Sequence, residues 1–95
     1  MPSVRLTEPA ANELRTMVRT HSLPSDTASR VERCARPLAQ FPNIGPALSG
    51  EWDGYRFLLG PWPWMVLVYE IVTPELVAIV AVQDARSSRA ATAAR

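Results

Sequence analysis

The apolar positions of the first forty residues recur mostly at helical spacing. Residues 3–6 alternate apolar and polar side chains and predict a short strand, after which Thr7 offers a favourable helix N-cap. The apolar stripe of the following helix contains Ala10, Leu14, Met17, Val18 and His21. Because His21 stands at the end of this stripe, we expect it to be partly buried or to cap the helix rather than to bind a ligand.

A second helix follows the turn at residues 22–26, with Ser25 or Asp26 as its expected cap. Its apolar side contains Val31, Cys34, Ala35 and Leu38. Pro37 has no amide hydrogen and crowds the carbonyl of Arg33, so the helix is expected to end or kink at Arg36. On this stripe, Cys34 is expected to be a small core residue. Two helices joined by a short turn predict an antiparallel helical hairpin.

The pattern changes to strands after residue 54. The preceding loop, at residues 41–54, holds three of the four glycines. Residues 55–59, 64–72 and 76–82 each predict a strand, and their connections are too short for crossovers. The predicted fold class is α+β, with an N-terminal strand at the sheet edge, an antiparallel helical hairpin on one face, and then a three-strand antiparallel meander.

Composition places the chain among ordinary globular proteins. It has 95 residues, of which 47% are hydrophobic and 20% charged, and we expect one domain over residues 1–87. Residues 88–95 are rich in alanine and arginine, and predict either a frayed tail or a short helix that forms on a partner. With no apolar run of membrane-spanning length and no signal peptide pattern, we expect a cytoplasmic protein without membrane contact.

Charge and metal-ligand content restrict the chemistry further. All ten basic residues are arginines and the net charge is +1, so composition gives no indication of nucleic-acid binding, and we expect no direct contact with DNA. One cysteine and one histidine nearly exclude a zinc site of the usual kind. We expect no cofactor and no metal.

Several short motifs lie in order along these elements. They are Phe41-Pro42 with Gly45, Tyr55-Arg56, Val68-Tyr69-Glu70 and Asp84-Ala85-Arg86, after an opening that reads VRLTEPAANELRTMV. In this order they resemble the RelE/ParE superfamily, the toxic halves of bacterial type II toxin–antitoxin pairs, over roughly residues 3–87. Asp84 stands where the family usually has a histidine.

The resemblance implies a β-α-α-β-β-β fold, growth inhibition, a role in plasmid stabilisation, and neutralisation by a cognate antitoxin whose N-terminal part binds DNA. A ParE-like toxin would act by binding, with DNA gyrase as target. A RelE-like toxin would instead cleave messenger RNA on the ribosome. A non-toxic interaction module that dimerises through its sheet edge is a further alternative.

The RelE-like alternative would use Arg56 and Arg86 to stabilise the charged phosphorane and Asp84 for proton transfer. Nothing after Arg86 titrates near neutrality, and both tyrosines are expected in the core. Arg86 and Asp84 are equally well explained as an exposed ion pair. The incomplete proton-transfer set therefore favours the ParE-like alternative.

Three tryptophans within residues 52–64 form the remaining unusual feature. Tryptophan is enriched at protein interfaces, and it also closes the open ends of small cores. We expect Trp62 to contact a partner, whereas Trp64, at a strand start, is slightly better explained as core. Trp62, Trp64 and the tail residue Arg89 make up the predicted partner-binding set.

Overall fold

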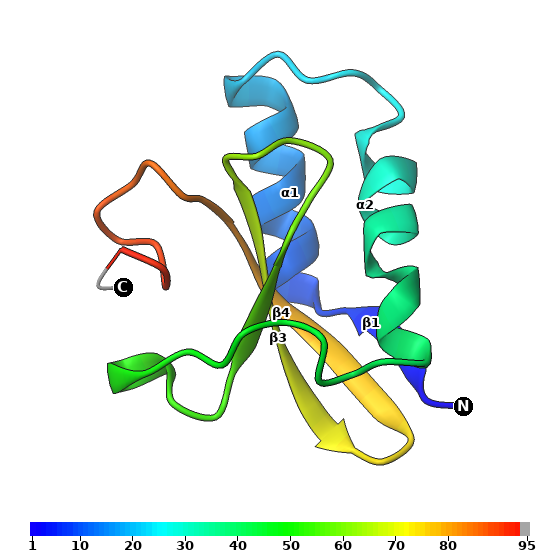
Figure 1. Ribbon diagram of the computed structural model, residues 1–95. Helices are drawn as coiled ribbons and strands as arrows, with labels where there is room; N and C mark the ends of the chain where they lie inside the picture. The colour runs from blue at the N-terminus through cyan, green and yellow to red at the C-terminus, as the bar shows by residue number, and fades with distance from the viewer. Residues whose placement is uncertain (94–95) are drawn as a thin grey trace.

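Four strands form a single mixed sheet in the order β1-β4-β3-β2 in the computed structural model, which describes residues 1–93 (Figure 1). The edge strand β1 (Ser3–Leu6) runs parallel to β4 (Leu76–Asp84). The meander of β2 (Arg56–Leu59), β3 (Met65–Thr73) and β4 is antiparallel throughout. The α+β prediction and the edge position of the first strand are both confirmed.

The first helix, α1 (Glu8–Thr20), begins where the sequence predicts. The hydroxyl oxygen of Thr7 accepts a hydrogen bond from the amide of Ala10, and the hydroxyl also lies within bonding distance of the Ile79 carbonyl. The amide of Thr7 donates to the same carbonyl at 3.0 Å. These bonds hold the start of α1 against β4.

The second helix, α2 (Thr27–Ala35), is shorter and ends as Pro37 predicts. The chain continues as a 3-10 turn, η1 (Arg36–Ala39), with the proline in its first turn. Asp26 occupies the N-cap position, but its carboxylate accepts from Arg30 instead of capping the helix backbone. Thr27 donates to the Pro24 carbonyl at 2.6 Å and so fixes the turn before the helix.

The main core lies between the sheet and the two helices. α1 packs directly on β4, whereas α1 and α2 scarcely touch each other within the described residues. The buried residues of this core include Ala10, Leu14 and Met17 from α1, Val31 and Ala35 from α2, Leu38 from η1, and Met65, Leu67, Tyr69, Val77, Ile79 and Val82 from the sheet. Both helices therefore cover the same sheet face, as the sequence predicts.

The opposite sheet face carries a second, smaller cluster of Leu48, Val66, Val68, Ala81 and Ala91. The loop that contains the short turn η2 (Gly50–Trp52) supplies part of its cover. The C-terminal residues supply the rest, because Ala90 and Ala91 are buried and the amide of Ala91 donates to the Gln83 side chain at 2.7 Å.

Residues 88–93 thus form turns packed on the sheet in place of a frayed tail, and a helix that forms on a partner stays a prediction. The last two positions of the expected tail, 94–95, lie outside the described residues. Among the described residues, no helix has the length and apolar character needed to cross a membrane.

Candidate functional site

The carboxylate of Asp84, the last residue of β4, is the centre of a polar cluster. It accepts hydrogen bonds from Nε and Nη2 of Arg86 at 2.9 and 2.8 Å, and from the Arg86 amide at 2.9 Å. These bonds hold the pKa of Asp84 well below its usual range, and the carboxylate in turn raises the pKa of Arg86. Asp84 is therefore a carboxylate throughout the physiological range and only accepts hydrogen bonds.

His21 reaches the same carboxylate from the C-terminal end of α1. Its Nε2 lies 3.0 Å from Oδ2 of Asp84, and Nδ1 lies 2.8 Å from the hydroxyl of Thr20. Because ionised Asp84 has no proton to give, Nε2 carries the hydrogen of their bond. The sequence places His21 at the end of an apolar stripe but gives no sign of Asp84, which is 63 positions away.

Two stacked tryptophans complete this end of the molecule. The ring of His21 stacks on Trp64 with centroids 4.9 Å apart, and Trp62 stacks on Trp64 at 6.1 Å. The guanidinium of Arg86 lies 4.8 Å from the Trp64 ring, and that of Arg30 lies 5.9 Å from Trp62.

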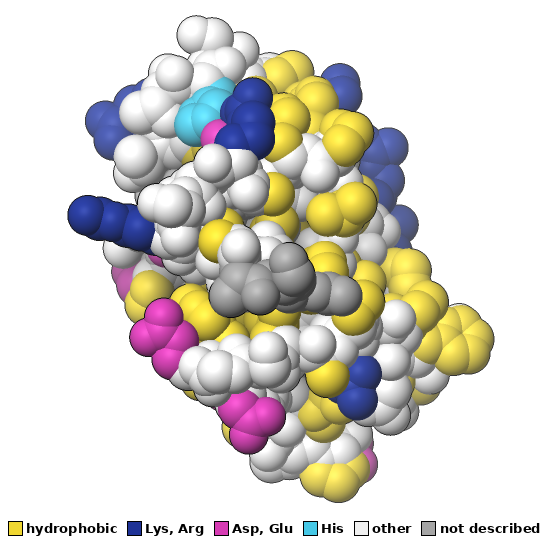
Figure 2. Space-filling model, turned by 60° about the vertical axis from the view of Figure 1, so that its left-hand side comes forward, with side chains coloured by type: hydrophobic (Ala, Val, Ile, Leu, Met, Phe, Trp, Pro, Cys, Tyr) yellow, Lys and Arg dark blue, Asp and Glu magenta, His cyan; other side chains and the backbone are white. Residues whose placement is uncertain are grey.

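We call the set His21, Trp62, Trp64, Asp84 and Arg86 the aromatic–ion cluster. Figure 2 shows the histidine at the surface with basic and acidic side chains against it. Both tryptophans are half-buried and pack on the main core. Each thus closes the end of the core and still presents some ring surface to solvent, and the contact with a partner expected of Trp62 stays a prediction.

A groove of about 490 Å³ lies beside the cluster, between α1 and the end of β4. Its polar lining includes Glu13, Thr20, His21, Asp84 and Arg89. Glu13 accepts the amide hydrogen of Val82 at 3.0 Å, where β4 continues past its pairing with β1. The guanidinium of Arg89 is exposed and has no acidic partner among the described residues.

Arg56, in contrast, is part of a separate structural clamp. Its Nη1 donates to the carbonyls of Gly45 and Asn43 at 2.8 and 3.3 Å. The hydroxyl of buried Tyr69 donates to the Pro42 carbonyl at 2.7 Å and accepts from the Gly45 amide at 3.0 Å. Burial raises the pKa of Tyr69. We call Pro42, Gly45, Arg56 and Tyr69 the loop clamp.

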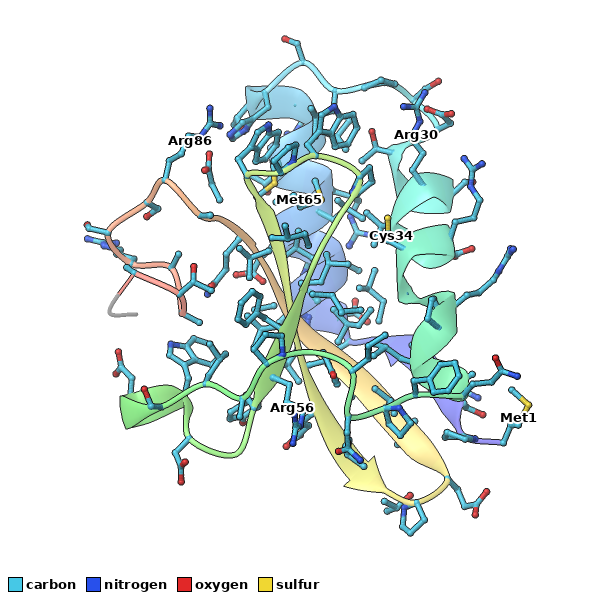
Figure 3. All side chains as sticks on the ribbon, viewed as in Figure 1. Met1, Arg30, Cys34, Arg56, Met65 and Arg86 are labelled. Carbon is cyan, nitrogen blue, oxygen red and sulfur yellow. The ribbon has the colours of Figure 1, made fainter. Side chains whose placement is uncertain are left out.

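The three candidate catalytic residues therefore fall into two groups. Asp84 and Arg86 lie together, whereas Arg56 is far from both (Figure 3). Arg56 pairs with Tyr69 of β3, and Asp84 pairs with Met65 of the same strand. Tyr69 and Met65 are four positions apart, so Arg56 and Asp84 are separated by roughly 13 Å along the strand direction. Arg56 also shares the sheet face of Tyr69, on the side of the helices, because directly paired residues point the same way.

The cluster contains the elements of acid–base chemistry, but each is already engaged. A carboxylate, an imidazole and a guanidinium lie within bonding distance of one another, as general acid–base catalysis requires. Both ring nitrogens of His21 are bonded, however, and the Asp84 carboxylate takes three bonds from Arg86. Within residues 1–93, no group of three or more His, Cys, Asp or Glu side chains is placed to hold a metal ion.

Comparison with solved structures identifies the fold, whereas no family model and no curated protein sequence matches the chain. A structure of the chromosomal ParDE toxin–antitoxin system from P. aeruginosa is 19% identical, with a TM-score of 0.68, covering 88% of this chain and 96% of that one. A chain of the RelBE2 toxin–antitoxin complex from Mycobacterium tuberculosis is 26% identical, with a TM-score of 0.65, over 88% and 99% of the two chains. One from the E. coli DinJ–YafQ toxin–antitoxin complex is 16% identical, with a TM-score of 0.60, over 87% and 91%.

These neighbours belong to type II toxin–antitoxin systems, and this chain has the fold of their toxins. The resemblance to the RelE/ParE superfamily that the sequence motifs predict is thereby confirmed. The neighbours include both ParE and YafQ types, so the fold by itself is compatible with either mode of action.

Proposed function

We propose that this protein is the toxin of a type II toxin–antitoxin system, that it inhibits growth by binding an essential target of the DNA gyrase type, and that a cognate antitoxin neutralises it. The observation that carries the binding mode is the position of Arg56, whose Nη1 donates to two loop carbonyls in the loop clamp. An arginine in that position supports the fold, and it lies on the sheet face that the helices cover, apart from Asp84 and Arg86.

Phosphodiester cleavage by a ribose hydroxyl needs more than a cation. It requires a base, an acid for the leaving oxygen, and positive charge held at the phosphorane. Arg86 is neutralised by Asp84, and Arg56 lies roughly 13 Å away along β3. A toxin that binds a protein target needs a surface and no such assembly, which favours the binding mode.

The exposed parts of the aromatic–ion cluster, together with Arg89, are the surface we assign to the target. Trp62 and Trp64 are half-buried aromatic anchors with guanidinium groups over their rings. Interface energy is concentrated in aromatic and arginine side chains of this kind. Arg89 lies in the adjacent groove with its charge unpaired among the described residues.

Induced expression in bacteria, followed by a supercoiling assay with purified gyrase, tests this function. We expect growth arrest, inhibition of supercoiling by the purified chain, and relief of both by the antitoxin encoded beside it. Arg89→Ala should weaken inhibition, whereas Arg33→Ala, on the exposed side of α2, should not. Normal growth on expression would contradict toxicity and leave a non-toxic interaction module as the function.

Ribosome-dependent cleavage of messenger RNA is the second candidate, and the contact between His21 and Asp84 favours it. His21 places its imidazole beside Asp84, at the strand end where the family usually has a histidine and this sequence has an aspartate. Primer extension on translated message distinguishes the two functions. Specific cuts within codons that disappear with His21→Ala and Arg86→Ala would replace the binding mechanism with cleavage, and intact message beside inhibited gyrase would exclude cleavage.

A further inference from the structure

A hydroxyl, an imidazole and a carboxylate form a continuous chain of hydrogen bonds at the end of α1. The hydroxyl of Thr20 lies 2.8 Å from Nδ1 of His21, and Nε2 of the same ring lies 3.0 Å from Oδ2 of Asp84. All three residues line the groove of about 490 Å³ between α1 and the end of β4. We call Thr20, His21 and Asp84 the hydroxyl triad.

The hydrogens of this chain point in one direction. Because ionised Asp84 only accepts, Nε2 of His21 carries a hydrogen, and Nδ1 of the neutral ring carries a lone pair that accepts from the Thr20 hydroxyl. The same hydroxyl lies 3.5 Å from the Met17 carbonyl, which is the longer and weaker contact. This is the arrangement in which a base activates a hydroxyl nucleophile while a carboxylate holds the base.

The imidazole of the triad is held in place on three sides. Its ring stacks on Trp64 with 16° between the two planes, and each of its nitrogens is bonded. Asp84 is fixed in turn by three hydrogen bonds from Arg86. A base and a carboxylate that are already oriented lose little conformational freedom when they react.

The groove beside the triad supplies room and positive charge. Its volume is within the range of pockets that bind small molecules. Arg89 lines the same groove, and its guanidinium has no acidic partner in the part of the chain that the structure describes. Attack on a carbonyl carbon produces an oxyanion, and a guanidinium offers it both charge and hydrogen-bond donors.

We propose that the hydroxyl triad cleaves small acyl esters, with Thr20 as nucleophile, His21 as general base and Asp84 as the residue that positions His21. Oγ1 of Thr20 bonds to the carbonyl carbon of the ester while its proton passes to Nδ1 of His21. The alcohol of the ester leaves with that proton, so that the acyl group remains on Thr20. Water then attacks this acyl group and gives a proton to Nδ1, and Oγ1 of Thr20 leaves with that proton. The activity goes beyond the proposed function and does not depend on it.

The purified full chain and p-nitrophenyl acetate test the site. The release of p-nitrophenol measures the reaction, and peptide mass spectrometry locates the acetyl group on the chain. His21 is the one histidine and the sequence has no lysine, so few other nucleophiles compete. We expect hydrolysis above the rate in buffer alone, with acetyl on Thr20.

Substitutions in the triad separate the three roles. Thr20→Val and His21→Gln should each lower kcat/KM at least about tenfold, whereas Thr20→Ser should retain activity. Asp84→Asn should lower kcat more than it changes KM, because an amide that donates to Nε2 moves the ring hydrogen to Nδ1. Thr16→Val, one turn earlier on α1, removes a hydroxyl that makes no hydrogen bond within residues 1–93, and should change kcat/KM less than about twofold.

Three results would overturn the hydroxyl triad. They are hydrolysis no faster than in buffer, acetyl found only on His21, Cys34 or the terminal amine, and full activity in Thr20→Val. Because Thr20 and His21 are exposed, circular dichroism should show an intact fold in their variants. Arg89→Ala should lower kcat in support of the oxyanion contact, and an unchanged kcat would remove Arg89 from the reaction.

Discussion

The loop clamp and the aromatic–ion cluster use the same residue type in opposite ways. In the clamp, Arg56 donates to the backbone of a loop, next to fully buried Tyr69. In the cluster, Arg86 is 63% exposed and binds Asp84 over the face of Trp64. Both arginines come from motifs that the family resemblance marks as functional, but the first stabilises the fold and the second lies at the surface.

This difference shows why a motif alone does not assign a role. The partners of Arg56 are carbonyls from a loop 11 and 13 positions earlier, and losing the arginine would leave the partly buried Gly45 carbonyl without this bond. The partners of Arg86 are one carboxylate and one ring, both open to water, where ion pairs contribute little to stability. Substitutions in the clamp should therefore affect folding, and substitutions in the cluster should affect mainly binding.

The largest effect should come from Gly45 in the clamp. A Cβ at this position would lie 2.2 Å from the Phe57 carbonyl and 2.9 Å from the Tyr69 ring, so the loop or the strand must move. We expect Gly45→Ala to lower the free energy of unfolding by about 3 kcal/mol, measured by urea denaturation. Gly60→Ala is the comparison, since the nearest atoms to its Cβ would be in the buried side chain of Met65 and not in the backbone, so a smaller loss is expected; an equal loss in both variants would contradict a specific clamp.

A smaller loss is expected when the clamp keeps its shape but loses its hydroxyl. Tyr69→Phe leaves the Gly45 amide and the Pro42 carbonyl without their bonds, which should cost about 2 kcal/mol in urea denaturation. Tyr55→Phe removes a hydroxyl that makes no hydrogen bond within residues 1–93, and should cost far less. Equal stabilities for the two variants would show that the hydroxyl contacts of Tyr69 do not support the loop.

Most of the fold follows from the sequence because it depends on local patterns. Thr7 and Pro37 mark the ends of helices through groups within a few positions, and the strands at residues 64–72 and 76–82 are visible as apolar runs. Their boundaries extend to Thr73 and Asp84 in the structure. Short connections then determine the antiparallel order of the meander.

The site follows from the sequence much less well because its contacts are distant in the chain. His21 and Asp84 are 63 positions apart, and no periodicity predicts that one helix end meets one strand end. Ala90 and Ala91 have side chains too small to mark a buried segment, yet they cover the second sheet face. Local motifs single out Trp62, Trp64 and Arg86 as candidates but do not predict that they meet, and Gly45 stands where a close backbone approach requires glycine.

In the aromatic–ion cluster, the stacked rings should contribute more to the free energy of unfolding than the ion pair between Asp84 and Arg86. Trp64 contacts His21, Trp62 and Arg86 and packs on the main core, so Trp64→Leu should lower the free energy of unfolding by about 1.5 kcal/mol. Trp52→Leu is the control, since that ring packs on the second cluster. Target binding should fall only in Trp64→Leu; a parallel fall in Trp52→Leu would indicate a general loss of structure.

The smallest effect should come from Asp84 and should depend on pH. Arg86 holds the pKa of Asp84 below its value in the unfolded chain, so the unfolded chain binds more protons as the pH falls below about 4. The stabilisation is therefore complete above that pH and is lost toward more acidic solution. Asp84→Asn should slightly lower the melting temperature at pH 7, and the difference from the native chain should shrink as the pH falls from 4 toward 2.

Salt gives a second measure of the same pair, because screening weakens exposed ion pairs. The difference in melting temperature between the native chain and Asp84→Asn at pH 7 should become smaller in about 1 M sodium chloride, where the Debye length is about 3 Å. Asp53→Asn, at an exposed position without an ion pair in residues 1–93, should have the melting temperature of the native chain at both low and high salt. If the difference in melting temperature for Asp84→Asn changes with neither pH nor salt, Asp84 acts through its hydrogen bonds at the strand end and not through its charge. The aromatic–ion cluster would then be a structural element like the loop clamp.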